Sequence, residues 1–153
     1  MGKSRAYLKG AAKNIQIADH MMYVTLPIVN ERRLLLKIFD EIYKAIINCM
    51  YSLLYYEFSL GRVKLSDVLS ENIALFLKLS QRNLLSREQL KLIQEIIVVH
   101  ERHSESALEF VRREKVVIMS DSLGVKSLDV RKTKEYLLVA KELLMQLTKK
   151  EYS

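Results

Sequence analysis

His100, Arg102 and His103 form the densest group of residues suited to acid–base chemistry in this 153-residue chain. The two histidines stand three residues apart, so on a continuous helix they share a face. Such a group could exchange protons or contact RNA. It lacks the carboxylate of a Glu-x-x-His metal pair, because Ile97 stands three residues before His100. The simplest interpretation is a solvated helix end, where histidines interact favourably with the C-terminal dipole.

The single cysteine, Cys49, excludes an intramolecular disulfide and any zinc site with several cysteines. It lies in an apolar stretch, which favours a buried, inert thiol and a reducing, cytoplasmic setting. The sequence holds no glycine-rich phosphate loop, no nucleophile elbow and no zinc-protease motif. We therefore predict no catalytic residue, no metal and no cofactor.

Basic residues recur at four-residue steps near the start of the chain. Arg5, Lys9 and Lys13 would lie on one face of a helix, about 6 Å apart along its axis. Successive phosphates of an extended nucleic-acid strand have a similar spacing, and Lys or Arg neutralise them without base contacts. The net charge of +7 favours a polyanionic partner, although an ordinary solvated face would look the same. A second candidate nucleic-acid-binding cluster consists of Arg112, Arg113 and Lys115.

Tyrosines gather near the end of a long apolar segment. Tyr51, Tyr55 and Tyr56 could stack on bases, but at this spacing they more often belong to a core or a subunit interface. Glu57 follows them on an otherwise apolar seam. A carboxylate there reaches solvent at the helix end, pairs with a cation, or has a raised pKa for function.

The apolar periodicity predicts helices that position these groups. A first helix covers about residues 4–23, and Pro27 then breaks the chain and biases Leu26 towards an extended conformation. Asn30 is a plausible N-cap for a helix over about 31–59, which ends near Gly61. That helix is apolar around most of its circumference, so it must be covered from more than one side.

The second half of the chain contains shorter elements. We expect helices over about 67–81 and after Ser86, which forms a capping box with Gln89. A second capping box at Ser106 predicts a short helix to about residue 113. Alternating residues over about 115–128 predict a β-hairpin, and Asp129 can cap a last helix over 130–149.

The resulting expectation is one mainly α domain over residues 1–153. It is a helical bundle of five to six helices around a long central helix, with a small β-hairpin before the C-terminal helix. No charge-free stretch approaches the roughly 20 residues that a membrane span needs, so we expect no membrane partner.

Residues 18–25 (ADHMMYVT) with Pro27, the long helix after them, and residues 109–121 (EFVRREKVVIMSD) carry a resemblance. Together they resemble a family of small uncharacterised archaeal helical proteins, which implies a fold but no function. More loosely, the first helix and the long central helix resemble the HEPN helical bundles, which often cleave RNA or act as toxin–antitoxin partners. Active HEPN proteins usually carry an arginine that is followed, after four to six intervening residues, by a histidine. No arginine stands at that distance before any histidine here, so this resemblance implies a non-catalytic bundle.

Three function classes follow. The leading interpretation is a non-enzymatic binding protein that contacts RNA or a ribonucleoprotein through its basic helical faces. The alternative is a protein–protein interaction module or homodimer built on the tyrosine-rich central helix. A third is a HEPN-like ribonuclease or toxin–antitoxin component that uses the histidine group.

Overall fold

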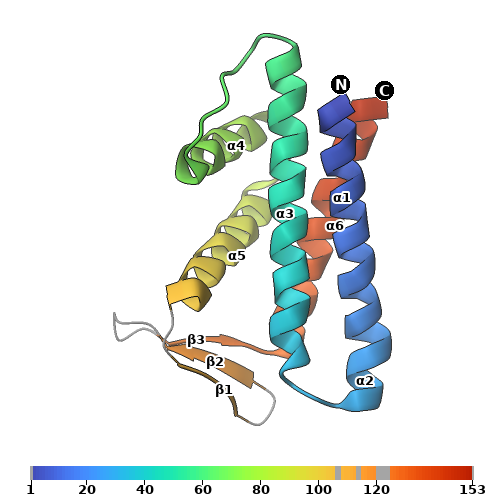
Figure 1. Ribbon diagram of the computed structural model, residues 1–153, viewed down its shortest axis with the longest axis vertical. Coiled ribbons are helices and arrows are strands. Elements are labelled where there is room, and N and C mark those ends of the chain that lie inside the picture. The colour runs from blue at the N-terminus through green and yellow to red at the C-terminus, as the bar shows by residue number, and fades with distance from the viewer. Residues whose placement is uncertain (1, 106–107, 113–114, 120–124, 153) are drawn as a thin grey trace.

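The computed structural model describes residues 2–105, 108–112, 115–119 and 125–152, which form a mainly helical bundle (Figure 1). Helix α1, the π-helical turn η1 and helix α2 make one continuous helical run, so the described residues form five helices. In chain order the elements are α1 (Gly2–His20), η1 (Met21–Thr25), α2 (Leu26–Val29), α3 (Leu34–Ser59), α4 (Leu69–Asn83), α5 (Arg87–Glu105), β1 (Leu108–Arg112), β2 (Lys115–Met119), β3 (Val125–Leu128) and α6 (Val130–Tyr152).

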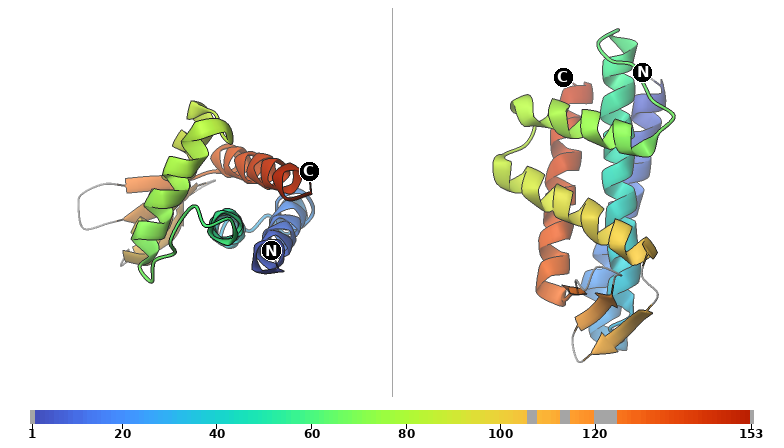
Figure 2. Two further views of the ribbon diagram at one scale, coloured as in Figure 1. Left: turned by 90° about the horizontal axis from the view of Figure 1, so that it is seen from above. Right: turned by 90° about the vertical axis from the view of Figure 1, so that its left-hand side faces the viewer.

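Helix α3 lies at the centre of the bundle. Helices α1 and α6 run along it, and α4 and α5 cross it on the other side (Figures 1 and 2). Its apolar arc is buried almost completely, including Phe39, Ile42, Ile46 and Met50. The prediction that this helix is covered from more than one side is therefore confirmed.

The prediction of a chain break at Pro27 is wrong. The chain stays helical through this residue, and Leu26 has helical angles, with φ −59° and ψ −44°. The Leu26 N–H donates to the carbonyl of Met21, five residues back, which is the wide π-helical turn. A widened turn leaves room for the proline ring and does not need its missing N–H, which explains why the helix continues.

Asn30 ends a helix rather than beginning one, so its prediction as an N-cap is also wrong. It has a left-handed backbone, with φ 52° and ψ 36°, and its N–H donates to the carbonyl of Leu26 at 2.8 Å. Asparagine tolerates this conformation better than most residues, which suits the C-cap of α2. Helix α3 then begins at Leu34.

Two predicted helix caps are confirmed. The Gln89 N–H donates to Ser86 Oγ at 3.1 Å and the Ser86 N–H to Gln89 Oε1 at 2.8 Å, which completes the capping box of α5. At the start of α6, the Lys132 N–H donates to Asp129 Oδ1 at 2.7 Å.

Residues 108–112 form a strand where we predicted a short helix. Strand β1 pairs antiparallel with β2, and Leu108 lies opposite Met119 in the register. Pairing with β2 gives the backbone of β1 hydrogen-bond partners along one edge, which outweighs the local preference expressed by a capping-box sequence. The cap residue itself, Ser106, lies outside the described residues.

Strands β2 and β3 also pair antiparallel, which gives the sheet order β1-β2-β3. They fall in the range of the predicted β-hairpin. Its turn, residues 120–124, lies outside the described residues, so the hairpin as a unit stays a prediction.

The core contains Cys49, which is fully buried, and burial raises the pKa of its thiol. An inert thiol agrees with the sequence analysis. No helix in the described part of the chain combines the length and apolar character that crossing a membrane requires.

Candidate nucleic-acid interface

The α1 face consists of Arg5, Lys9 and Lys13, and all three side chains are exposed. The opposite side of α1 is buried through residues such as Leu8 and Ile15. The predicted stripe of cations on one face of the first helix is therefore present.

A polar seam fixes the orientation of α1 against α3. Ser4 Oγ donates to the carbonyl of Ser52 at 2.8 Å, and Ser52 Oγ donates to the carbonyl of Ser4 at 2.9 Å. Further along, Asn48 Nδ2 donates to Asn14 Oδ1 at 2.7 Å. Reciprocal hydrogen bonds in a buried interface specify one rotation of the helix, and this rotation turns the α1 face outward.

Tyrosines from two helices pack together beside this seam. The ring centroid of Tyr7 on α1 lies 5.3 Å from that of Tyr51 and 5.5 Å from that of Tyr55, both on α3. Lys3 Nζ lies 5.1 Å from the centroid of Tyr55. The structure thus brings Tyr51 and Tyr55 together in an intramolecular cluster, whereas Tyr56 contacts Lys150, whose Nζ lies 5.5 Å from its ring centroid.

The histidine group lies at the end of α5. The His100 ring stacks on Tyr43 with centroids 3.4 Å apart and ring planes 7° apart. Partial burial lowers the pKa of His100, although the nearby Asp40 carboxylate acts in the opposite direction. Arg102 and His103 are half-buried on the same helix end. Within the described residues, no three side chains of the His, Cys, Asp or Glu type are grouped to hold a metal ion.

The second predicted basic cluster lies at the sheet. Arg112 ends β1 and Lys115 begins β2, and the two are paired in the register. Arg113 lies outside the described residues. The side chains of Arg112 and Lys115 are not described either.

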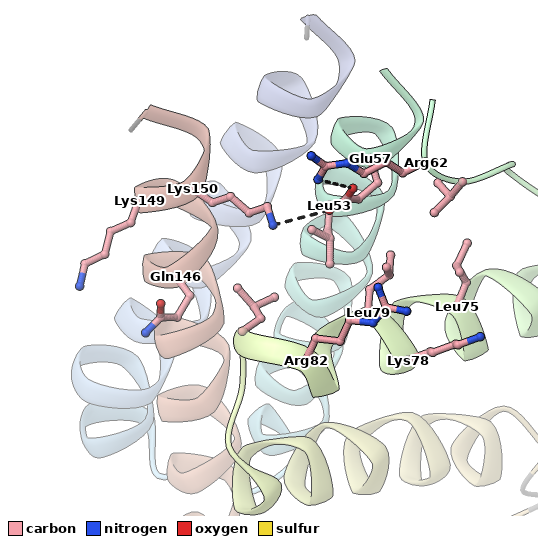
Figure 3. Close-up of a pocket in the computed structure, with 12 residues that line it drawn as sticks. Leu53, Glu57, Arg62, Leu75, Lys78, Leu79, Arg82, Gln146, Lys149 and Lys150 are labelled. Atoms are coloured by element: carbon pink, nitrogen blue, oxygen red, sulfur yellow. Dashed lines mark hydrogen bonds and ion pairs between the residues drawn. The ribbon is translucent and has the colours of Figure 1, made fainter. Parts of the chain in front are cut away.

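A groove with a volume of about 770 Å³ lies between the C-terminal half of α3, the segment that follows it, α4 and the last turns of α6 (Figure 3). We call it the basic groove, because five cations line it against one carboxylate. The cations are Arg62, Lys78, Arg82, Lys149 and Lys150, and the carboxylate belongs to Glu57.

The end of α3 positions Arg62 in the basic groove. Gly61 has a left-handed backbone, with φ 72°, which a residue with a side chain rarely adopts. The Gly61 N–H donates to the carbonyl of Phe58 at 2.9 Å, and the Arg62 N–H donates to that of Glu57 at 3.0 Å. These two bonds form a Schellman motif, which reverses the chain and returns Arg62 beside the last turn of α3.

Glu57 is buried and paired with two cations. Its side chain is 7% exposed, Arg62 Nη1 donates to its Oε2 at 3.2 Å, and Lys150 Nζ lies 3.6 Å from its Oε1. Of the three alternatives that the sequence allowed for Glu57, pairing with a cation is the one observed. The contacts from both sides compensate the burial of the carboxylate.

The other three cations of the basic groove come from α4 and α6. Lys78 and Arg82 are four residues apart on α4 and share a face with Leu75 and Leu79 (Figure 3). Lys149 lies in the last turn of α6. All three side chains are exposed, and none of them forms an ion pair with another side chain in the part of the structure that is described.

A mutual pair of hydrogen bonds holds the segment before α4 in place. The Ser66 N–H donates to Asn72 Oδ1 at 3.0 Å, and Asn72 Nδ2 donates to the carbonyl of Ser66 at 2.9 Å. Asn72 is buried, and Phe76, one turn further along, is fully buried in the core. This anchoring fixes the wall of the basic groove that carries Lys78 and Arg82.

Sequence reasoning missed the cations of the basic groove. Glu57 on an apolar seam was a usable signal, because a buried carboxylate requires a cation and Arg62 follows the helix-ending glycine directly. The four-residue step from Lys78 to Arg82 repeats the pattern of the α1 face. No sequence feature places α4 beside the end of α6.

Comparison with known proteins identifies no relative. No protein-family model matches the chain, and no curated protein or solved structure is significantly similar to it. The function must therefore be argued from the residues of the α1 face and the basic groove themselves.

Proposed function

We propose that this protein is a non-enzymatic binding protein that contacts RNA, alone or within a ribonucleoprotein, through its basic helical surfaces. The observation that carries the proposal is the excess of cations in the basic groove, five against one carboxylate. The carboxylate of Glu57 is already compensated by Arg62 and Lys150. Lys78, Arg82 and Lys149 therefore present positive charge to a ligand.

A concave surface strengthens this charge. Lines of electric field concentrate in a cleft with walls of low dielectric constant, which raises the local concentration of anions. Leu53, Leu75 and Leu79 supply apolar wall surface between the cations. The α1 face adds a second basic surface, along which an extended strand could be held.

Part of the cation density also has a structural role. Arg82 lies in the last turn of α4, and Lys149 and Lys150 lie in the last turn of α6, where positive charge offsets the helix dipole. Lys78 lies outside these last turns, and Arg62 follows the end of α3. Helix stabilisation alone does not explain why all five cations line one groove.

A salt titration tests the proposal. Binding of a single-stranded RNA 12-mer is measured by fluorescence anisotropy at several salt concentrations, and the RNA is checked on a gel for cleavage. If the three cations of the α1 face together with Lys78, Arg82 and Lys149 neutralise phosphates, the slope of log K against log salt is roughly −4. Intact RNA with such a slope is the expected result.

Three outcomes separate the alternatives. No binding at low salt refutes the RNA proposal. A salt-independent association of the chain with itself or with a protein favours the protein–protein alternative, because burial of apolar surface is weakly screened. Cleavage of the RNA favours the ribonuclease alternative.

A further inference from the structure

Four aromatic rings form one cluster at the end of the bundle where α1 begins and α3 ends (Figure 1). The rings of Tyr7 and Tyr55 lie nearly parallel, with planes 10° apart, and Tyr51 packs beside Tyr7. Phe58 lies edge-on to Tyr55, with centroids 6.5 Å apart and ring planes 89° apart. We call these four residues the aromatic cluster.

The aromatic cluster is only partly covered by the rest of the protein. Tyr7, Tyr51 and Tyr55 are half-buried, and their contacts help to pack α1 against α3. Phe58 is 51% exposed, and its ring packs on Tyr55 of its own helix. Half of the Phe58 surface is therefore left for a ligand at the outer end of the cluster.

The surroundings of the aromatic cluster favour a polyanionic ligand. Residues 2–18 of α1 contain four cations and no Asp or Glu, and residues 48–56 of α3 carry no charge. Exposed Lys3 lies beside the rings, with its Nζ 5.1 Å from the centroid of Tyr55. An apolar protein partner would bury this ammonium group without a counter-charge, which is costly, whereas a phosphate would pair with it.

We infer that the aromatic cluster binds unpaired bases of a single-stranded RNA, with Phe58 as the outermost ring on which a base stacks. The inference rests on the proposed function and goes further, because it names the state of the RNA that is recognised. Aromatic side chains stack on any base, since every base has a π face. Bases within a duplex are already stacked and paired, so this surface selects single strands.

The tyrosine hydroxyls do not oppose the binding of RNA. Burial raises the pKa of Tyr7 above its ordinary value, and the neighbouring hydroxyls of Tyr55 and Tyr51 raise it further. The Tyr7 phenol is therefore neutral at physiological pH and does not repel a phosphate. Its O–H group can also donate a hydrogen bond to a base or to the RNA backbone.

The test compares RNA with and without accessible bases. The probes are a single-stranded 12-mer of uridine, an abasic 12-mer with the same ribose-phosphate backbone, and the uridine 12-mer paired with a 12-mer of adenosine. The two single strands carry equal charge, so a difference between them reports on the bases. We expect the wild type to bind the uridine 12-mer about tenfold more tightly than the abasic strand.

Two variants with a matched control locate the effect. F58L should weaken binding of the uridine 12-mer about fivefold, and Y55L/F58L should remove the preference for bases, while binding of the duplex stays within about twofold. Y23L is the control, because Tyr23 is also 51% exposed and has Lys134 Nζ 5.3 Å from its ring centroid. It should change nothing, and circular dichroism verifies that all three variants keep the helical content of the wild type.

Photochemical crosslinking of the wild-type protein gives a second readout that needs no variant. One uridine of the 12-mer is replaced by 5-iodouridine, the complex is irradiated, and mass spectrometry locates the crosslinked residue. We expect crosslinks at Phe58 or Tyr55. Crosslinks confined to residues outside the aromatic cluster would contradict the inference.

The outcomes distinguish this inference from the proposed function. Equal binding of the uridine and abasic strands overturns the inference and leaves RNA binding through the cations in place, as does a preference for bases that Y55L/F58L retains. A preference for bases without any salt dependence overturns the proposed role of the cations and supports the inference. Absence of binding by all three probes overturns both. If F58L binds RNA like the wild type but sediments as a smaller species, the aromatic cluster is a subunit interface and the inference is wrong.

Discussion

The α1 face and the basic groove present the same kinds of side chain in two different arrangements. On the α1 face, Arg5, Lys9 and Lys13 follow one another at four-residue steps along a single exposed helix. In the basic groove, Lys78 and Arg82 of α4 line one concave surface together with cations from other segments. The arrangement on the α1 face is determined by one helix, whereas that of the basic groove is determined by the packing of α3, α4 and α6.

This difference has an electrostatic consequence. Cations on a convex helix are surrounded by water and screened over about 10 Å at 0.1 M salt. The field of cations that line a cleft with apolar walls is focused into that cleft and is screened less. The same number of cations should therefore contribute more to anion binding in the basic groove than on the α1 face.

The largest effect is expected from the groove variant. Its three charge reversals, K78E/R82E/K149E, should weaken RNA binding about 100-fold at 0.1 M salt, because they turn the centre of the positive field negative. An anisotropy titration measures the change. An effect no larger than that of a matched control would show that the basic groove does not bind RNA.

The matched control is K37E/K91E/R131E. It also reverses one arginine and two lysines, all of them exposed and none on the α1 face or lining the basic groove. It lowers the net charge by the same amount as the groove variant. Its effect on RNA affinity should stay within about threefold, because it acts only through the overall field.

The α1 variant should have an intermediate effect. R5E/K9E/K13E should weaken RNA binding about tenfold and equally for all sequences, because phosphate contacts carry no base information. The magnitude of the salt slope should fall by about two to three units. Unchanged affinity and slope would show that the α1 face is only solvated.

Gly61 beside the basic groove and Gly10 on α1 allow a comparison of the two regions with a smaller expected effect. G61A places a side chain on a left-handed backbone, which should lower the free energy of unfolding by about 1 kcal/mol and move Arg62. RNA affinity should fall about threefold. Urea unfolding and the RNA titration measure the two effects.

G10A is the counterpart on α1. Its added Cβ would lie 3.1 Å from Asn48 Nδ2, so it disturbs the seam with α3 rather than a charged surface. The α1 face points away from this seam, and RNA affinity should remain unchanged. A loss equal to that of G61A would show that the two glycines act through general stability.

His100 provides the smallest expected effect. Burial lowers the pKa of the folded-state imidazole below its ordinary value of 6.5, so the folded protein takes up this proton less readily than the unfolded chain. The contribution to stability is complete above pH 6.5 and is lost as the pH falls towards the lower folded-state pKa. Three charged or titratable groups act on it: Asp40, His103 and Glu101.

The variant H100Q should flatten this part of the pH profile of stability while RNA binding at pH 7.5 stays the same. Urea unfolding at pH 5 and 7.5, for the wild type and the variant, measures the difference. An unaltered profile would show that another group titrates, and a loss of RNA binding would assign the histidine group to the interface.

Much of the fold could be predicted from local sequence signals. The caps at Ser86 and Asp129 act within four residues, and the apolar arc of α3 reports its burial directly. The predictions for Pro27 and Asn30 are wrong because each residue type occurs in two settings. Proline can break a helix or follow a widened turn within one, and asparagine can begin or end a helix. The outcome depends on the π-helical turn before Pro27 and on the left-handed backbone of Asn30, and neither is visible in the sequence.

The two candidate surfaces also differ in how far the sequence alone reveals them. The α1 face repeats every four residues on one helix, so periodicity reveals it. The basic groove joins Arg62 with residues about 20 and 90 positions further along the chain, and only the packing of α4 and α6 against α3 brings them together. Strand β1 was missed for a related reason, because its partner β2 determines its conformation.

Lysine footprinting of the wild-type protein tests the central claim most directly. The protein is acetylated briefly with and without saturating RNA, and mass spectrometry gives the protection of each lysine. The account predicts strong protection of Lys78 and Lys149, weaker protection of Lys9 and Lys13, and none of the exposed Lys91. Equal reactivity of Lys78 and Lys149 with and without RNA would contradict it.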